Sequence, residues 1–342
     1  MRPSFIAALV ANAALLALGG AGGCSGGAGR ARDVVGSAGS GSTSSGAIVV
    51  PEPPTAAPPV AKANRPRPVA HAAARALAVD DTHLYYGDSE DDGVYAVLKT
   101  GGEPLRIARH APVAGAFALN GSTLVWIASP GDAVLKAPIG GGVQPVTLRD
   151  RGIFADVAAA SDDIFIAEAI GGGGALLRVT GATASRLGTF DGPPRAVMAD
   201  RSHVFILTPS KIFRTPHQRA ELETLATGTR FTYSETDDDF VYVVTEIDRE
   251  RVVARVAKTG GSLSIVARGV REAPIDVEGG ELFFFDATRP QLRAVAASGG
   301  DSRVLAEDEA LGAVSALEAD TATVYVGTGI HESAYVVAIQ RR

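Results

Sequence analysis

Short apolar runs recur along the whole chain, and each pair of runs is separated by an acidic or small polar turn. The clearest example is residues 78–86, where Asp80, Asp81 and Thr82 separate two apolar segments. The second run of each unit is marked by one apolar residue: Leu84, Leu124, Ile164, Val204, Val241, Leu282 and Val324. Their spacings are 40, 40, 40, 37, 41 and 42 residues. A fixed period of this size is typical of a repeat architecture.

Each unit reads as four short strands. In the first unit they span residues 75–79, 83–86, 93–98 and 104–108, and a Lys-Thr-Gly-Gly turn at 99–102 joins the last two. The same turn returns at 258–261, and Gly-rich turns at 139–142 and 298–300 occupy the same place. Glycine supplies the backbone angles of tight hairpins. The pattern predicts an all-β, seven-bladed β-propeller with four-stranded antiparallel blades; six blades with a degenerate unit is the alternative.

The last unit ends after its third strand, because only Gln340, Arg341 and Arg342 follow it. An unpaired blade edge is a liability that closed β structures avoid. We therefore predict that an N-terminal strand within residues 60–71 completes the seventh blade.

The N-terminus has the composition of a secretory signal. Arg2 precedes an uncharged apolar stretch at 5–18, and small residues at 19–23 lead to Cys24, the single cysteine. The stretch is shorter than the ~20 residues of a membrane span. We predict a signal peptide at 1–23, a lipidated Cys24 with a Gly/Ser/Pro-rich tether at 24–70, and a propeller at 71–342. The alternative is a plain secretory signal in which Cys24 is incidental.

Charge is divided unevenly along the chain. Residues 25–70 contain five basic and two acidic residues, whereas residues 71–342 have a net charge of −10 within a whole chain of −6. An acidic folded domain argues against a nucleic-acid partner. As a coil, the tether would span roughly 40 Å, enough to hold a domain away from a membrane.

Two repeat segments carry a family resemblance. Residues 84–89 read Leu-Tyr-Tyr-Gly-Asp-Ser, and residues 124–126 read Leu-Val-Trp. Together with the Gly-Gly turns, they resemble bacterial propellers of the TolB-like and Tyr-Trp-Thr-Asp-like superfamilies, and the small residues before Cys24 resemble a bacterial lipoprotein signal. The resemblance implies a binding scaffold whose function lies in the loops of one face.

A repeat separates structural from functional candidates, because a residue type found in every blade is expected to be structural. By this criterion the polar turns between first and second strands are structural: Asp80 and Asp81, Asn120, Asp162 and Asp163, Asp200, Asp237 to Asp239, Glu278 and Asp320. Residues 88–93 imitate half of a calcium loop, but its last ligand position is Lys99. Gly171 to Gly174 are expected to form a flexible loop between the second and third strands.

The histidines give no catalytic pattern. His83 and His203 share a repeat position, and His110 and His331 stand in loops without metal-ligand spacing. We predict no catalytic residue, no metal and no cofactor. The competing hypothesis is a propeller hydrolase or lyase, which would require three or more of these residues to meet in one pocket: His110, His331, Glu246, Asp88 and Asp150.

The loops that link successive blades carry the sharpest functional hypothesis. They hold a set of basic residues: Arg109, His110, Arg149, Arg151, Arg195, Arg230, Arg268 and Arg271. Guanidinium groups around one mouth of the channel could bind carboxylates or phosphates, although solvated loop charge is the simpler interpretation. We predict a monomeric, lipid-anchored binding or scaffold module of the cell envelope, periplasmic or cell-surface, that recognises a protein, peptide or glycan on this face.

Overall fold

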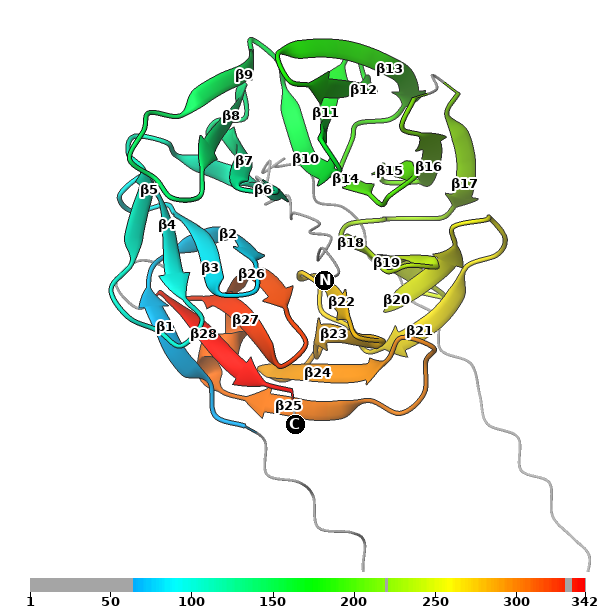
Figure 1. The fold of residues 1–342 in the computed structure, drawn as a ribbon. Coiled ribbons are helices and arrows are strands. Elements are labelled where there is room, and N and C mark those ends of the chain that lie inside the picture. Colours follow the sequence, from blue (N-terminus) through cyan, green and yellow to red (C-terminus); the bar gives the residue numbers. More distant parts are fainter. Residues whose placement is uncertain (1–63, 219–220, 330–333, 342) are drawn as a thin grey trace, which may run out of the picture. The chain divides into compact units, whose positions relative to one another are not determined.

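A computed structural model describes residues 64–341 except 219–220 and 330–333, and the predictions for the signal, Cys24 and most of the tether lie outside these residues. Twenty-eight strands form seven sheets of four strands each. Figure 1 shows the sheets arranged in a ring, each with its first strand innermost. The chain is a seven-bladed β-propeller, as the period of the apolar runs predicts.

The first three blades use the strands in chain order from the inside outwards. Blade 1 contains β2 (Ala74–Val79), β3 (His83–Asp88), β4 (Gly93–Leu98) and β5 (Leu105–Ala108). Blade 2 contains β6 (Val113–Asn120), β7 (Thr123–Ala128), β8 (Ala133–Pro138) and β9 (Val146–Asp150). Blade 3 contains β10 (Phe154–Ala160), β11 (Asp163–Ile170), β12 (Gly173–Thr180) and β13 (Thr183–Asp191).

The next three blades repeat this order. Blade 4 contains β14 (Ala196–Ala199), β15 (His203–Leu207), β16 (Lys211–Pro216) and β17 (Glu223–Thr227). Blade 5 contains β18 (Ser234–Thr236), β19 (Phe240–Ile247), β20 (Glu250–Ala257) and β21 (Ser264–Arg268). Blade 6 contains β22 (Asp276–Glu278), β23 (Glu281–Phe285), β24 (Gln291–Ala296) and β25 (Arg303–Glu307), followed by the short 3₁₀ helix η1 (Glu309–Gly312).

Blade 7 combines both ends of the described chain. It contains β26 (Val314–Ala319), β27 (Thr323–Thr328), β28 (Tyr335–Gln340) and, on its outer edge, β1 (Arg67–His71). β1 pairs with β28 antiparallel, with Arg67 opposite Ala338 and His71 opposite Tyr335. The predicted N-terminal closing strand is therefore confirmed, and the folded part includes residues 67–70 at the end of the segment assigned to the tether.

The apolar residues that mark the repeat lie in the second strand of each blade. Leu84, Leu124, Val204, Val241, Leu282 and Val324 are each 0% exposed, and Ile164 is 6% exposed. The side chains of adjacent blades pack together in seven clusters, one at each junction, such as the one that joins Tyr85 of blade 1 to Trp126 of blade 2. Burial of both faces of each blade explains why the strands read as almost continuous apolar runs.

The Gly-rich segment of blade 3 is not the flexible loop that the sequence suggested. Gly171 and Gly172 form a two-residue turn with φ of 51° and 85°, which a β-hairpin of this kind requires. Gly173 and Gly174 belong to β12, and a Cβ on Gly174 would collide with the ring of Phe190. These two glycines therefore let β13 pack closely along β12.

Candidate ligand-binding face

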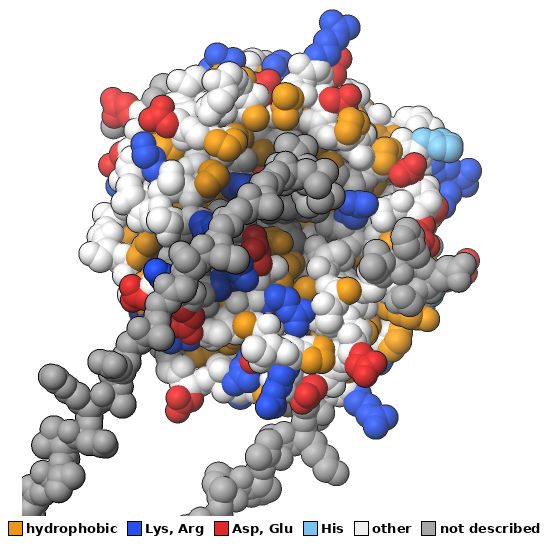
Figure 2. All heavy atoms as spheres, turned by 180° about the vertical axis from the view of Figure 1, so that it is seen from behind, with side chains coloured by type: hydrophobic (Ala, Val, Ile, Leu, Met, Phe, Trp, Pro, Cys, Tyr) orange, Lys and Arg blue, Asp and Glu red, His pale blue; other side chains and the backbone are white. Residues whose placement is uncertain are grey.

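Six of the eight predicted basic residues lie on connections from the outer strand of one blade towards the inner strand of the next, and Arg149 and Arg268 lie at the ends of the outer strands β9 and β21. This topology places them at the end of the propeller that also holds the turns between second and third strands. The eight residues differ in their surroundings: some are bonded to other groups of the protein, and others are exposed to solvent. In Figure 2, which views the ring from the side opposite to Figure 1, Lys and Arg side chains are interspersed with Asp and Glu over the surface that is not drawn in grey.

The basic residues at the ends of blades 4 and 5 are mostly engaged within the protein. Arg230 pairs with Glu246 at 2.7 Å, and Arg268 forms an ion pair with Glu250. Arg271 instead donates to backbone carbonyls on the loops around it, including that of Leu311 at 2.8 Å. Arg271 therefore braces neighbouring loops, and Arg230 and Arg268 are largely neutralised. Arg195, which precedes β14, is half-buried.

The basic residues of blades 1 and 2 are different. Arg109 and His110 are exposed and make no hydrogen bond or ion pair within the described part of the chain. The side chain of Arg151 is 92% exposed, and its nearest acid is Asp150 at 4.0 Å, the limit of an ion pair. Arg149 has a buried Nε that no described group accepts. Arg109, His110 and Arg151 therefore have exposed donors for an external ligand.

The backbone is left-handed at three of the eight predicted basic residues. His110 and Arg151 have φ of 49° and 59°, and Arg230, which is paired with Glu246, has φ of 55°. The outer strands of blades 1, 2 and 5 each contain a β-bulge, and the first paired residues after it are Ala108, Arg149 and Ala267. His110, Arg151 and Gly269 lie two residues after these, and Gly269 has φ of 64°. A non-glycine residue in this conformation costs about 1–3 kcal/mol, and such strain concentrates at functional sites. Blades 1 and 2 therefore keep bulky polar side chains where glycine would be less strained.

An exposed aliphatic side chain stands beside this cationic group. Ile153, two residues after Arg151, is 70% exposed, the largest value among the large hydrophobic residues that the structure describes. A ligand for this face can therefore combine an anionic group with an apolar one.

The acidic turns on the opposite end are structural, as the sequence indicated. Oδ1 of Asp80 accepts from the amides of Thr82 and His83, and its Oδ2 accepts from the hydroxyl of Tyr85 at 2.6 Å. Asp237 and Asp320 repeat this pattern. Each accepts hydrogen bonds from two amides of its turn and from the hydroxyl of the tyrosine five residues later, Tyr242 and Tyr325 respectively. These carboxylates close the turns that join first and second strands.

The Lys-Thr-Gly-Gly turns join neighbouring blades. Nζ of Lys258 lies 2.8 Å from Oδ2 of Asp200, and Nζ of Lys99 lies 2.8 Å from Oδ2 of Asp320. In both pairs the lysine belongs to one blade and the aspartate to the preceding blade. Burial raises the pKa of Asp200, but the bonds from Lys258 and from the amides of Ser202 and His203 lower it further, to about 2.

Four buried carboxyl groups on the inner strands were not singled out by the sequence. Asp156, Glu235, Asp276 and Glu318 lie on β10, β18, β22 and β26 and are at most 8% exposed. Asp156 accepts from the amides of Val157 at 2.9 Å and of Val197 in the next blade at 2.7 Å. Asp276 repeats this arrangement with the amides of Val277 and Ala319. The Asp156 and Asp276 side chains therefore connect the inner strands of successive blades.

Burial raises the pKa of all four inner carboxyl groups. For Asp156, burial outweighs the two amide hydrogen bonds, which favour the ionised form. Burial raises the pKa of Asp276 to about 7. Burial also raises the pKa values of Glu235 and Glu318 well above their ordinary value, and the neighbouring negative charge of Asp276 adds to this effect. A single acid in a mostly apolar first strand is the sequence signal for Asp156 in β10 and Glu318 in β26, whereas the three-residue strands β18 and β22 around Glu235 and Asp276 carry no such signal.

The candidates for metal binding and catalysis do not converge in the described chain. Asp91 of the calcium-like loop bonds to Tyr95 and Arg106, and Asp88 accepts from the amide of Glu90. Among the described residues, no three His, Cys, Asp or Glu side chains are placed to hold one metal ion. Glu246 is paired with Arg230, and His331 lies outside the described residues. No helix of the described part is both long and apolar enough to cross a bilayer.

Comparison with known proteins identifies the fold and no family. No protein-family model and no curated protein matches the chain. Among solved structures it is similar to a streptogramin B lyase, with 11% identity over 81% of this chain and 97% of that one and a TM-score of 0.63. It is also similar to the extracellular domain of the two-component system BT4673 from B. thetaiotaomicron, with 10% identity over 82% and 40% of the two chains and a TM-score of 0.59.

A third similar structure is the computationally designed Ika8 protein, with 15% identity over 78% of this chain and 83% of that one and a TM-score of 0.53. The likeness is one of fold. At these identities the shared architecture carries no activity from one protein to another.

Proposed function

We propose that the chain is a binding module of the cell envelope whose ligand docks on the blade-linking loops of blades 1 and 2. The observation that carries the proposal is the pair of strained, exposed positions at His110 and Arg151, where an equivalent loop uses Gly269. Within the described part of the chain, His110 has no side-chain partner and Arg151 has only Asp150 at 4.0 Å, so the strain at these two positions is consistent with selection for an external contact.

The ligand that fits this face is an acidic polypeptide segment with an aliphatic side chain. Arg109 and Arg151 offer exposed planar guanidinium groups, which bind carboxylates with two parallel hydrogen bonds. Ile153 offers an apolar contact next to them. Because the folded domain is acidic overall, the cationic loops would also orient an acidic partner towards this end of the ring.

The cellular address belongs to the same proposal. The apolar N-terminal stretch and the small residues before Cys24 support secretion and lipidation of that cysteine, and the tether would hold the propeller away from the membrane surface. Replacing Cys24 by Ser and labelling cells with an alkyne-bearing fatty acid tests this part. Label on the wild type and none on the variant supports lipidation, and equal labelling contradicts it.

Affinity purification from the organism's own envelope tests the binding role. The mature wild-type chain is compared with an Arg109→Ala, Arg151→Ala double variant, and an Arg268→Ala variant serves as the matched control because Arg268 is already paired with Glu250. We expect one protein to be retained by the wild type and the control but lost by at least about tenfold with the double variant, since two charged hydrogen-bonded contacts are removed. Equal recovery with all three chains would refute a binding face on blades 1 and 2.

A further inference from the structure

The outer strand of blade 3 is unlike those of the other blades. β13 has 9 residues, whereas the six other outer strands, β1, β5, β9, β17, β21 and β25, have 4 or 5. β13 pairs with β12 from Thr183 to Asp191, and it is the last strand of its sheet. Its other edge therefore offers a long row of backbone donors and acceptors that no described strand uses.

The junction between blades 3 and 4 also lacks a brace that other junctions have. At four successive junctions an arginine donates to one equivalent carbonyl in the next blade: Arg214 to Lys258, Arg255 to Ala297 at 2.7 Å, Arg303 to Arg341 at 3.0 Å and Arg67 to Lys99 at 3.1 Å. Arg178 occupies the position of Arg214 and Arg255 in blade 3, each opposite an aromatic residue of the second strand. It pairs instead with Asp163 of its own blade at 2.7 Å.

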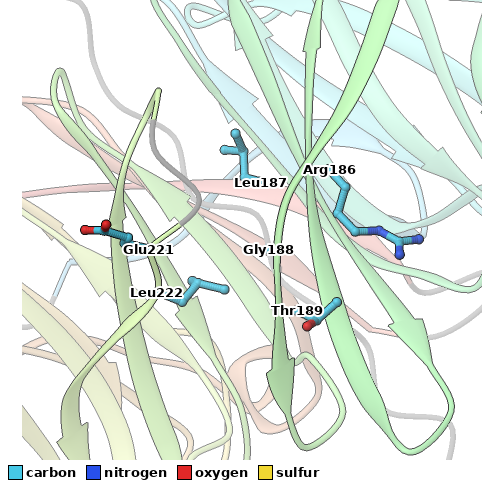
Figure 3. Close-up of a pocket in the computed structure, with 6 residues that line it drawn as sticks. All are labelled: Arg186, Leu187, Gly188, Thr189, Glu221 and Leu222. Carbon is cyan, nitrogen blue, oxygen red and sulfur yellow. The ribbon is translucent and has the colours of Figure 1, made fainter.

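A groove of about 620 Å³ lies along β13 at this junction. It is lined by Arg186, Leu187, Gly188, Thr189, Glu221 and Leu222. Figure 3 shows Leu222 pointing towards β13, while Arg186 and Glu221 point away from the space between the two segments. Leu222 packs against the buried cluster that contains Leu187 and Phe190. The groove therefore has an apolar floor directly beside the free strand edge.

The residue at the middle of this strand edge, Arg186, is positively charged. Arg186 is exposed and makes no hydrogen bond or ion pair with another residue of the described chain. A second copy of the chain paired through its own β13 would bring the two Arg186 side chains towards each other, and like charges across strands are destabilising. The edge is complementary to a different segment, one that places an acidic residue opposite Arg186.

We propose that β13 is a docking strand for an extended segment of a partner protein, which adds antiparallel to blade 3 as a fifth strand. Main-chain hydrogen bonds along the edge supply affinity, and side chains at alternating positions supply specificity. An aliphatic side chain of the segment packs over Leu187 and Leu222, and an acidic one faces Arg186. This edge is separate from the loops of blades 1 and 2, so either site can bind without the other.

The test uses the full mature chain and the peptide acetyl-Ser-Thr-Val-Glu-Val-Thr-Ser-amide, with a second peptide that carries Lys in place of Glu. Affinity is measured by titration, and the bound region is found by amide hydrogen exchange. We expect the Glu peptide to slow exchange within residues 183–191 and to bind Arg186→Glu roughly fivefold more weakly, with the Lys peptide restoring binding to that variant. Arg201→Glu, at an exposed arginine in the turn between β14 and β15, is the matched charge reversal and is expected to change nothing.

Other outcomes overturn the docking strand. They are no binding of the Glu peptide at about 1 mM, slowed exchange on another strand only, or equal affinity for wild type and Arg186→Glu. A Glu peptide with N-methylated amides must also bind more weakly, because the edge hydrogen bonds are lost. Sedimentation that shows a wild-type dimer dissolved by Arg186→Glu would identify a second copy as the occupant, against the proposal.

Discussion

Oδ2 of Asp156 in blade 3 accepts a 2.7 Å hydrogen bond from the backbone amide of Val197 in blade 4. The same carboxyl accepts from the amide of Val157, and the side chain is 0% exposed. One side chain thus satisfies buried donors of two successive inner strands. The Asp276 carboxyl does the same for blades 6 and 7 through Ala319.

Asp156→Ala is expected to lower the free energy of unfolding by about 2–4 kcal/mol, because two buried amides lose their acceptor. Asp156→Asn keeps one acceptor oxygen and should cost less. Urea denaturation followed by circular dichroism measures both, and Asp162→Ala on the exposed turn of the same blade is the control. Equal stability of Asp156→Ala and Asp162→Ala would show that the inner carboxyl does not hold the two strands together.

The raised pKa values of the inner carboxyl groups predict that the free energy of unfolding falls as pH rises. The pKa of Asp276 is about 7 in the fold against an ordinary value of 3.8, and the pKa values of Glu235 and Glu318 are raised as well. The folded chain therefore holds protons that the unfolded chain releases between these values. This contribution to stability is complete below the ordinary pKa and is lost as pH rises through the raised one.

The measurement is the free energy of unfolding at about pH 5.5 and at about pH 8, where the wild type should be more stable at the lower pH by more than about 1 kcal/mol. A variant with Asp276→Asn, Glu235→Gln and Glu318→Gln keeps the other titrating groups, including His217, and should show a much flatter dependence. A wild type with the same pH dependence as this triple variant would contradict the raised pKa values.

The ion pair between Lys258 and Asp200 predicts the opposite pH dependence. The pKa of Asp200 is lowered to about 2, so its contribution is present above the ordinary value of 3.8 and is lost as pH falls towards 2. Lys258→Met should destabilise the propeller by about 1 kcal/mol near neutral pH, a modest value because the pair is partly solvated. The difference in melting temperature between Lys258→Met and wild type should become smaller on acidification. A difference that stays constant with pH would exclude the ion pair as its cause.

The repeat itself was readable from sequence because it rests on local signals. Apolar residues at a fixed period, glycines in the turns and a last unit without its fourth strand predict the blades and the closure by β1. The turn carboxylates such as Asp80 were also readable, since their partners lie within five residues. These features depend on neighbours in sequence or on the repeat.

The candidate site was less predictable because its properties depend on other blades. The sequence placed Arg230 and Arg109 in equivalent loops, but only the structure shows that Arg230 is paired with Glu246 while Arg109 has no described partner. The inner position of Asp156 and the free edge of β13 likewise follow from the closed ring. A flexible loop was predicted at Gly171 to Gly174 because four glycines suggest mobility; close packing of Phe190 was the actual reason for two of them.

The assignment of both binding surfaces depends on a ring closed by pairing β1 with β28. His71 and Tyr335 are opposite each other across this pair, with ring centroids 4.9 Å apart. In a Cys24→Ser background, His71→Cys with Tyr335→Cys is expected to form an intramolecular disulfide on mild oxidation and to resist unfolding more than its reduced form. Mass spectrometry of the oxidised protein gives the answer: a linked monomer is the predicted result, and free thiols or only intermolecular dimers would contradict the closed ring.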